Sequence, residues 1–359
     1  MSTVWLLLLG LVAYSVYKMC TTKMAVRLLR LIYEYRCKDY VKFIAEHKRL
    51  FAEAQAKGGN HAACTGHFYD LMAELIELYY GPSFHFAPPR YKGQNNDEAL
   101  QDFHAKVAHL LQLAPGKKCL DLGCGVGGLL RDVGRESGAS VTGITLSDEE
   151  VRIGNELNQS MGLGHICSIV KGNMQRLPFE ESSFDAVYGV YTLKYLTQPE
   201  LERTLQEVRR VLKPGGMFLV YCLMKTDKYD ESNPEHRALI SGFEYSCGMP
   251  ALHYTKRMKQ DCIQAGMTPL AHFDSSHDNL QWYTFFAENR LLRFLLTSRL
   301  IRTLMYVAEA VRILPAKFTE FMQIFIVNNV ISIYKAGSMG IMSGSEYLIF
   351  QKPVAGPSH

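Results

Sequence analysis

The sequence lacks the charge and metal-ligand patterns of several protein classes. Its net charge is only +4 over 359 residues, and Lys and Arg are spread along the chain instead of gathering into a stripe. Because the phosphate backbone of nucleic acids requires such a stripe, we expect no nucleic-acid partner. The nine cysteines are an odd number, with no C-x-x-C pair and no Cys/His cluster at zinc spacing. They predict small core residues in a reducing compartment, and no metal site.

Charge is also missing from the beginning of the chain, between Val4 and Tyr17, before Lys18 and Lys23. This run is shorter than the roughly 20 residues that a membrane-spanning helix needs, although a thin bilayer is more forgiving. The basic residues follow the apolar run, whereas a signal peptide usually carries them in front. We predict a hydrophobic membrane anchor or interfacial helix over 1–22 with the rest of the chain in the cytosol. The alternative is an N-terminal helix packed on a cytoplasmic protein.

The remaining sequence predicts an α/β protein. Hydrophobic residues make up 48% of the chain, which is enough for a substantial core. We expect a helical region over 23–95 that ends in a loop rich in Pro, Gly and aromatic residues. After it, we expect a helix over 98–113 and then short apolar strands at 118–122, 140–146, 168–171, 184–190 and 216–224, with helical segments between the strands. This alternation is typical of a parallel sheet with helices on both faces, and we assign it to a domain over 96–288.

The composition changes again near residue 289. Two long apolar segments with spaced basic residues are followed by EYLIFQ, a predicted closing strand over 346–351. We assign 289–353 to a separate helical module with a broad apolar face. It is either ordinary core packing or a lid over a lipid-sized pocket that contacts a membrane. No internal repeat or low-complexity tract is visible.

The strongest chemical motif is CLDLGCGVGG over 119–128, after the first predicted strand. Its glycines Gly123, Gly125 and Gly127 allow a tight turn and close approach of a ligand, and Asp121 can accept hydrogen bonds. A dinucleotide site would also require an acidic residue at the end of the next strand, which instead ends at Thr145. The motif therefore favours S-adenosylmethionine (SAM) over NAD.

Two later passages agree with a SAM-dependent methyltransferase domain. GNMQRLPFEESSFDAVY, over 172–188, places Asn173 and Met174 after the third strand, where such enzymes hold the adenine. VLKPGGMFLV, over 211–220, has the helix, turn and strand that close the sheet in the same superfamily. Glu150, after the second strand, either reaches the ribose or is a solvated residue in the first turn of a helix. We expect these residues to bind the cofactor together with the glycine loop.

From about 68 to 353 the chain resembles the sterol C-methyltransferases, best known for methylating carbon 24 of the sterol side chain. The most specific similarities are GPSFHFAPPRYKG over 81–93, TDKYDESNPEH over 226–236 and GMP over 248–250, with Trp282-Tyr283. The resemblance implies a Rossmann-like, class I SAM-dependent methyltransferase with N-terminal helices and a helical C-terminal sterol methyltransferase module. It also implies a sterol substrate and an association with the endoplasmic reticulum membrane. A homo-oligomer is left open.

Several departures from the family lie at functional positions. The stretch YTLKYLTQP has Leu193 and Thr197 where the family has Glu and His. Cys222 and Leu223 replace a Glu-Trp pair, Tyr79 and Tyr80 replace Gly-Trp, and Cys247 replaces an acidic residue, whereas Glu77 and Glu244 are retained. Methylating a side-chain double bond creates a carbocation that acidic and aromatic groups stabilise. Loss of two carboxylates is hard to reconcile with that chemistry.

Family-like proteins of animals that do not make sterols, such as nematodes, methylate carbon 4 of the sterol nucleus instead. On a 3-oxo sterol that reaction requires a base for the acidic proton and a donor for the enolate oxygen. For these roles we predict His85 and Tyr80 as acid/base and orienting groups, Tyr191 and Tyr195 as oxygen donors and Glu244 as a base. Each has a structural alternative. For His85, which lies between two Phe, the alternative is a packing residue. Asp227, Tyr229 and His236 are expected to hold their loop together or to position the substrate.

The sequence thus predicts a SAM-dependent sterol C-methyltransferase, with carbon 4 of a 3-oxo sterol narrowly preferred to carbon 24. Methyl transfer to another small or lipid acceptor is one alternative, which the apolar C-terminal module disfavours. A catalytically inactive sterol-binding protein is the other. The intact glycine loop argues against it.

Overall fold

The computed structural model describes residues 38–56, 61–80, 85–276, 280–283 and 297–354, and only the backbone of residues 73–80. The chain divides into two compact units. One comprises 1–46 and 298–323, and the other comprises 47–297 and 324–359. The predicted anchor over 1–22 lies outside the described residues. None of the described helices is long and apolar enough to cross a membrane.

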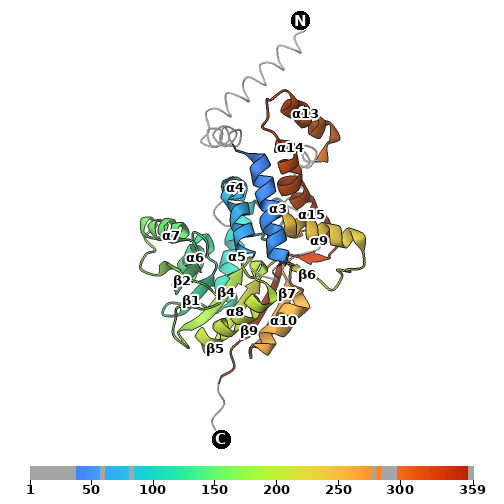
Figure 1. Cartoon of the computed structure of the whole chain (residues 1–359). Helices are drawn as coiled ribbons and strands as arrows, with labels where there is room; N and C mark the ends of the chain where they lie inside the picture. Colours follow the sequence, from blue (N-terminus) through green and yellow to red (C-terminus); the bar gives the residue numbers. More distant parts are fainter. Residues whose placement is uncertain (1–37, 57–60, 81–84, 277–279, 284–296, 355–359) are drawn as a thin grey trace. The chain divides into compact units, whose positions relative to one another are not determined.

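A seven-stranded sheet organises the larger unit, with strand order β3-β2-β1-β4-β5-β9-β7 (Figure 1). Its strands are β1 (Lys118–Leu122), β2 (Ser140–Thr145), β3 (Cys167–Lys171), β4 (Phe184–Val190), β5 (Leu212–Tyr221), β7 (Thr268–Asp274) and β9 (Glu346–Gln351). Strands β1 to β5 are parallel, and β9 runs antiparallel between β5 and β7. The predicted α/β fold is confirmed, with two antiparallel strands added at one edge.

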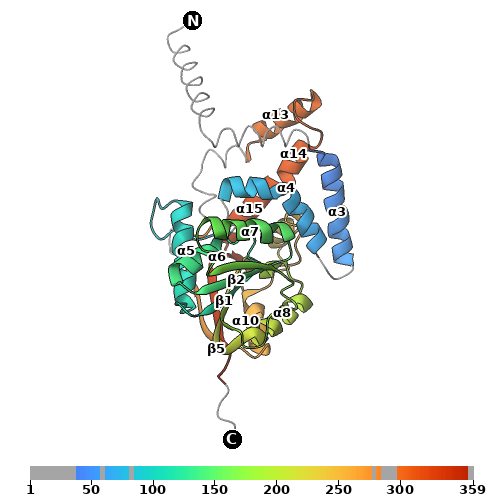
Figure 2. The same cartoon turned by 90° about the vertical axis from the view of Figure 1, so that its left-hand side faces the viewer.

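The parallel strands are formed by short apolar runs because helices cover both faces of the sheet. Residues 119–122 of β1 are all buried, and so are most of those in β4 and β5. Figure 2 shows α5 (Asn96–Leu110) and α6 (Gly128–Ser137) on one side of the strands and α8 (Gln198–Val211) on the other. The core between the strands and α8 includes Leu120, Val187, Leu201, Leu205 and Phe218, none of them measurably exposed.

The other helices of this unit are α4 (Ala62–Tyr80), α7 (Asp148–Ser160), α9 (Pro234–Ser246), α10 (Thr255–Gln264) and α15 (Asn328–Ser338). Side-chain caps fix where several of them begin. Asn95, Ser147 and Asn233 each accept a hydrogen bond from a backbone N–H in the first turn that follows. Two short strands, β6 (Met224–Lys225) and β8 (Met342–Ser343), pair beside the main sheet. A helix α3 (Tyr40–Ala56) begins in the smaller unit and ends in the larger.

The smaller unit contains α13 (Arg299–Ala310) and α14 (Phe318–Phe321) and continues into the π-helix η2 (Met322–Val327). Tyr40 packs against Phe318 and Phe321, with ring centroids 5.3 and 4.7 Å away. By contrast, α13 has no buried residue. Within the segment predicted as a C-terminal module, 289–353, residues 298–323 belong to this unit, and residues 346–351 form β9, a strand of the central sheet.

Candidate functional site

The carboxyl ends of β1, β2 and β4 bring the glycine motif to the point where the strand order reverses. In open α/β sheets this is the usual ligand site. Gly123 and Gly127 have φ of +67° and +80°. A Cβ on Gly123 would lie 2.1 Å from Oγ1 of Thr192, and one on Gly127 would lie 2.8 Å from Cδ1 of Ile169. Both backbone angle and space therefore require glycine.

Asp121 lies buried at the end of β1, beside this loop. Its Oδ2 accepts a hydrogen bond of 2.9 Å from the hydroxyl of Tyr188. Burial raises the pKa of the Asp121 carboxyl to about 7, and the Tyr188 hydrogen bond only partly opposes this. A buried carboxyl with a neutral donor as its partner is suited to receiving a positively charged ligand group.

The other predicted cofactor residues follow the neighbouring strands. Glu150 accepts a hydrogen bond from Oγ1 of Thr145 at the end of β2, and its backbone N–H donates to Ser147 in the cap of α7. Exposed Asn173 uses its side-chain oxygen to accept from the N–H of Gln175, which shapes the turn after β3. Met174 is half-buried, and its Cε lies 3.5 Å from where a Cβ of Gly123 would be.

These residues fit SAM. A Cβ added to Gly125, at φ +55°, would meet nothing within 4 Å, so the loop opens onto free space. Asp121 and Glu150 are acceptors of the kind that an ammonium group and hydroxyl groups require. Met174 adds an apolar surface for a flat ring.

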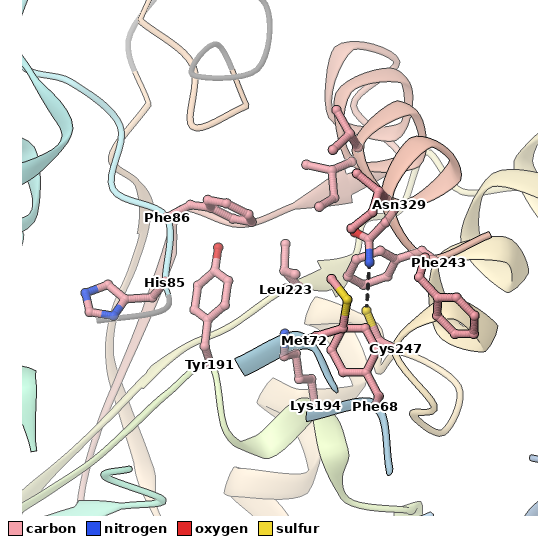
Figure 3. A pocket seen from close by; sticks show the side chains of 14 residues that line it. Phe68, Met72, His85, Phe86, Tyr191, Lys194, Leu223, Phe243, Cys247 and Asn329 are labelled. Carbon is pink, nitrogen blue, oxygen red and sulfur yellow. Dashed lines mark hydrogen bonds between the residues drawn. The ribbon is translucent and has the colours of Figure 1, made fainter. Parts of the chain in front are cut away.

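An apolar cavity lies between the carboxyl ends of β4 and β5 and helices α4, α9 and α15 (Figure 3). Its volume is about 80 Å³. Phe68, Met72, Phe86, Leu223, Phe243, Phe325, Ile326, Val330 and Ile333 provide its apolar lining. The polar lining residues are His85, Tyr191, Lys194, Cys247 and Asn329. An apolar cavity with a few polar groups suits a largely hydrophobic ligand.

Of the predicted catalytic residues, His85 and Tyr191 line this cavity. The Tyr191 hydroxyl donates a hydrogen bond of 2.8 Å to the Gly344 carbonyl. Figure 3 shows the His85 side chain beyond Tyr191, with its imidazole directed away from the middle of the cavity, and Nε2 of the ring lies 2.9 Å from Nε2 of His104 on α5. Burial and the neighbouring His104 lower the pKa of His85 well below its ordinary value. The lowered pKa keeps the imidazole neutral where it packs against α5.

Two predicted residues, Tyr195 and Glu244, are not among the residues that line this cavity. Tyr195 shares a hydrogen bond of 2.6 Å with the hydroxyl of Tyr69. On α9, Glu244 accepts a hydrogen bond of 2.7 Å from the N–H of Leu252, and burial raises the pKa of its carboxyl to about 7. The side chain of Tyr80, like that of Glu77, is outside the described part of the chain. In the loop before α9, the rings of Tyr229 and His236 stack with centroids 6.1 Å apart.

The structure brings in three residues that the sequence did not single out. The side chain of Lys194 reaches the cavity, with its nitrogen 5.2 Å from the ring centre of Tyr191 and 4.8 Å from that of Tyr195. Burial lowers the pKa of its ammonium group. His104 and Asp132 extend from His85 towards the surface. The sequence offered no signal for the latter two, since both lie within ordinary helical patterns.

Comparison with known proteins decides the family. Residues 120–220 match the family model described as a methyltransferase domain. The chain is 38% identical to the sterol 4-C-methyltransferase of Caenorhabditis elegans over 326 residues, which cover 90% of this chain and 96% of that protein. It is 33% identical to the cycloartenol-C-24-methyltransferase of Arabidopsis thaliana over 267 residues, which cover 73% and 79%. The chain belongs to the sterol C-methyltransferase family.

Membership confirms the predicted enzyme class and identifies SAM as the methyl donor of this sterol C-methyltransferase. The fold agrees. Geranyl diphosphate C-methyltransferase of Streptomyces coelicolor has a similar structure, with a TM-score of 0.55 at 16% identity, covering 78% of this chain and 97% of that one. The class I methyltransferase fold with N-terminal and C-terminal helices, which the resemblance implied, is thus established.

Proposed function

We propose that this sterol C-methyltransferase methylates carbon 4 of a 3-oxo sterol. The observation that carries the proposal is the pairing of a buried lysine with an apolar cavity. Lys194, whose ammonium nitrogen lies over the rings of Tyr191 and Tyr195, is among the described residues that line the cavity. Only 2% of Lys194 is exposed, so its charge acts in a medium of low dielectric.

The positive charge of Lys194 favours carbon 4 over carbon 24 as the methyl acceptor. Methylation of a side-chain double bond creates a positive charge on the sterol, which an ammonium group nearby destabilises. Removal of a proton from carbon 4 of a 3-oxo sterol moves negative charge onto the oxygen at carbon 3. An ammonium group that donates a hydrogen bond to that oxygen stabilises the enolate. Lys194 therefore supports chemistry on the sterol nucleus.

The proposed residue roles follow from these contacts. Lys194 holds the oxygen at carbon 3, and His85 and Glu244 are the two predicted bases for the proton at carbon 4. Tyr191 and Phe86 form an aromatic wall, with ring centroids 5.7 Å apart at 81°. When bound between the glycine loop and Asp121, SAM supplies an electrophilic methyl group and leaves as S-adenosylhomocysteine. The apolar lining excludes water from the enolate.

The relatives include enzymes of both specificities, and the match to the carbon-4 enzyme supports our choice. A sterol 4-C-methyltransferase matches 90% of this chain at 38% identity, whereas the Arabidopsis carbon-24 enzyme matches 73% at 33%. The cavity of about 80 Å³ is smaller than the few hundred Å³ that usually bury a drug-sized ligand. We therefore expect a sterol to widen it, with the polar end that carries the oxygen towards Lys194.

One experiment tests the acceptor. The purified protein is incubated with methyl-labelled SAM and two sterols in parallel, a 3-oxo sterol with a saturated side chain and a 3-hydroxy sterol with a carbon-24 double bond. We expect label only in the first, on carbon 4 by mass spectrometry. Label only in the second would overturn the proposal in favour of carbon 24. Label in neither would favour another acceptor or an inactive sterol-binding protein.

We also propose that the enzyme works at the cytosolic surface of the endoplasmic reticulum membrane, from which an apolar substrate is taken. Helix α13 supports contact with a bilayer. Its residues Leu300, Leu304 and Val307, together with Val311 just beyond it, form one stripe at helical spacing and are each at least half exposed. The charged Arg299 and Arg302 lie on the opposite side of the helical wheel, which is typical of interfacial helices that bind anionic lipids.

A further inference from the structure

A groove distinct from the apolar cavity of Figure 3 lies between α5, the segment 87–90 and the end of the sheet formed by β9 and β7. Its volume is about 540 Å³, whereas that of the cavity is about 80 Å³. Sites for small molecules usually measure roughly 300–1,000 Å³. None of the described residues lines both. His85 lines the cavity and Phe103 lines the groove, and their ring centroids are 4.8 Å apart, so a thin wall of side chains separates the two.

The groove combines an apolar lining with a single cation that has no ionic partner. Its apolar residues include Ala87, Pro88, Ala99, Phe103 and Leu110. Arg90 is neutralised by Asp102, which lies 3.2 Å away, and both line the groove. His109 lies 3.4 Å from Glu136. Lys106 remains, because no carboxylate in the described part of the chain lies within ion-pair distance of it.

The ammonium group of Lys106 is held in place by two aromatic rings. Its nitrogen lies 4.8 Å from the ring centre of Tyr347 and 5.0 Å from that of Phe273. These two rings stack with centroids 5.0 Å apart at 19°. Attraction to the ring faces keeps the charge in position without neutralising it. Burial and the neighbouring Arg90 lower the pKa of Lys106, and a negative charge in the groove would oppose both effects.

The hydroxyl of Tyr347 is the second polar group without a partner. Only 1% of Tyr347 is exposed, and no described residue forms a hydrogen bond with its hydroxyl. This oxygen is nevertheless not one of the fully buried, unpaired side-chain oxygens of the described chain, which belong to Thr319 and Ser343. The exposed part of Tyr347 therefore includes its hydroxyl, which reaches the groove.

The fold itself gains nothing from this hydroxyl. Phe at position 347 would make the same ring contacts, and a largely buried hydroxyl without a hydrogen bond costs free energy of folding. A ligand in the groove that accepts a hydrogen bond would offset that cost. The lone cation and the unpaired donor lie on the same pair of stacked rings, so one anionic group can contact both.

We propose that the groove binds an amphipathic carboxylate, such as the anion of a fatty acid. The carboxylate accepts hydrogen bonds from the Lys106 ammonium and the Tyr347 hydroxyl, and the hydrocarbon part lies against the apolar lining. A neutral lipid would leave the Lys106 charge unpaired, and a wholly polar anion would leave the apolar lining uncovered. The inference does not rest on the proposed function, because no residue of the apolar cavity takes part in it.

Calorimetry on the full-length protein tests the site with dodecanoate, used below the concentration at which it forms micelles. Dodecanol is the neutral probe of the same chain length, and we expect the wild type to bind it more weakly. Lys106→Met keeps an apolar side chain over the two rings but removes the charge. We expect it to bind dodecanoate at least about 10-fold more weakly, because a charge-assisted hydrogen bond is lost. Its affinity for dodecanol should equal that of the wild type.

Tyr347→Phe should also weaken dodecanoate binding by about 10-fold. Without ligand its melting temperature should be equal to that of the wild type or higher, whereas loss of a structural hydroxyl would lower it. Lys225→Met is the matched control, because the Lys225 ammonium also lies over two rings, 4.4 Å from that of Tyr254 and 5.2 Å from that of Tyr229, and Lys225 does not line the groove. It should bind dodecanoate as the wild type does.

Lys194→Met distinguishes the groove from the apolar cavity. If it weakens dodecanoate binding and Lys106→Met does not, the ligand occupies the cavity and the proposal is overturned. Equal affinity of the wild type for dodecanoate and dodecanol would overturn it as well, and so would a wild type that binds no dodecanoate. Weaker binding by Lys106→Met and Tyr347→Phe, with wild-type affinity in Lys194→Met and Lys225→Met, supports it.

Discussion

The ammonium nitrogen of Lys194 lies 5.2 Å from the ring centre of Tyr191, whose hydroxyl donates a hydrogen bond to the Gly344 carbonyl. Because that bond uses the single hydroxyl proton of Tyr191, a sterol oxygen in the cavity cannot receive it without breaking the bond. Lys194 has three N–H donors and lies on the same wall. Of the two residues, Lys194 is therefore the better donor to an enolate oxygen.

Replacing Lys194 with Met should lower kcat for a 3-oxo sterol by about 100-fold, because removing one donor to a developing oxyanion usually has an effect of this size. SAM affinity should not change. Lys225→Met is a matched control, since Lys225 is also buried and lies 4.4 Å from the ring centre of Tyr254, outside the cavity. Initial rates and calorimetric binding test both variants. A Lys194→Met enzyme with the wild-type rate would contradict the role of Lys194.

Binding of SAM should release a proton from Asp121. The pKa of its carboxyl is about 7 without ligand because it is buried, so at pH 6 most molecules carry the proton. The ammonium group of the ligand favours the carboxylate, and the proton leaves as the ligand binds. We expect SAM affinity to rise between pH 6 and 8, with proton uptake by the buffer near pH 6 and almost none at pH 8. Calorimetry in two buffers of different ionisation enthalpy measures this.

Asp121→Asn should remove both the pH dependence and the proton release, with weaker binding at pH 8. Asp185→Asn is a suitable control, because Asp185 lies at the opposite end of the strands and accepts hydrogen bonds from Lys213 and the N–H of Lys118. If Asp121→Asn releases as many protons as the wild type, another group accounts for them.

Much of the fold could be predicted because its strands are local apolar runs. The predicted strands 118–122, 184–190 and 346–351 agree with β1, β4 and β9 at both ends. β7, Thr268–Asp274, was missed because almost all of its residues are exposed and it pairs only with β9. Its hydrogen bonds are set by a strand almost 80 residues away, so the sequence around it carries no periodic signal.

The part of the site that could be predicted from the sequence is the part where the backbone conformation restricts the residue type. A turn like that at Gly123 requires glycine, and the motif shows it directly. Lys194 was missed because the departures from the family in this stretch fall on Leu193 and Thr197. The backbone of Tyr191 has φ of +56° and leads into the 3₁₀ turn Leu193–Tyr195, which buries Leu193 completely in the core and directs Lys194 to the cavity. The sequence does not show this backbone conformation, so it does not show which side chain of the stretch reaches the cavity.

Glu244→Gln should stabilise the protein at alkaline pH. Burial raises the pKa of the Glu244 carboxyl from 4.5 to about 7, so the group contributes most to stability below pH 4.5 and this contribution is lost as pH rises through 7. Gln keeps an oxygen for the N–H of Leu252 and never ionises. The gain in melting temperature over the wild type should therefore increase from pH 5 to pH 8.

Glu235→Gln on the same helix is the control, because Glu235 is exposed and its nearest charge, on Lys335, lies 3.8 Å away. It should show no such trend. The methylation rate of the same variant also distinguishes between His85 and Glu244 as the catalytic base. Glu244→Gln should keep the wild-type rate if His85 is the base, and a loss of about 100-fold or more would instead favour Glu244.

The exposed stripe on α13 should bind lipid. Leu304→Glu with Val307→Glu places two charges where a bilayer would receive apolar side chains, each of which contributes roughly 1.5–3 kcal/mol when fully buried. We expect the double variant to bind vesicles of phosphatidylcholine and phosphatidylserine at least about 10-fold more weakly in sedimentation assays. Met161→Glu is the control, because Met161 is 53% exposed, as Leu304 is, but caps the end of α7 in the other unit. Its vesicle binding should equal that of the wild type. Equal binding by all three proteins would exclude α13 as the contact with the membrane and leave the segment over 1–22 as the predicted one.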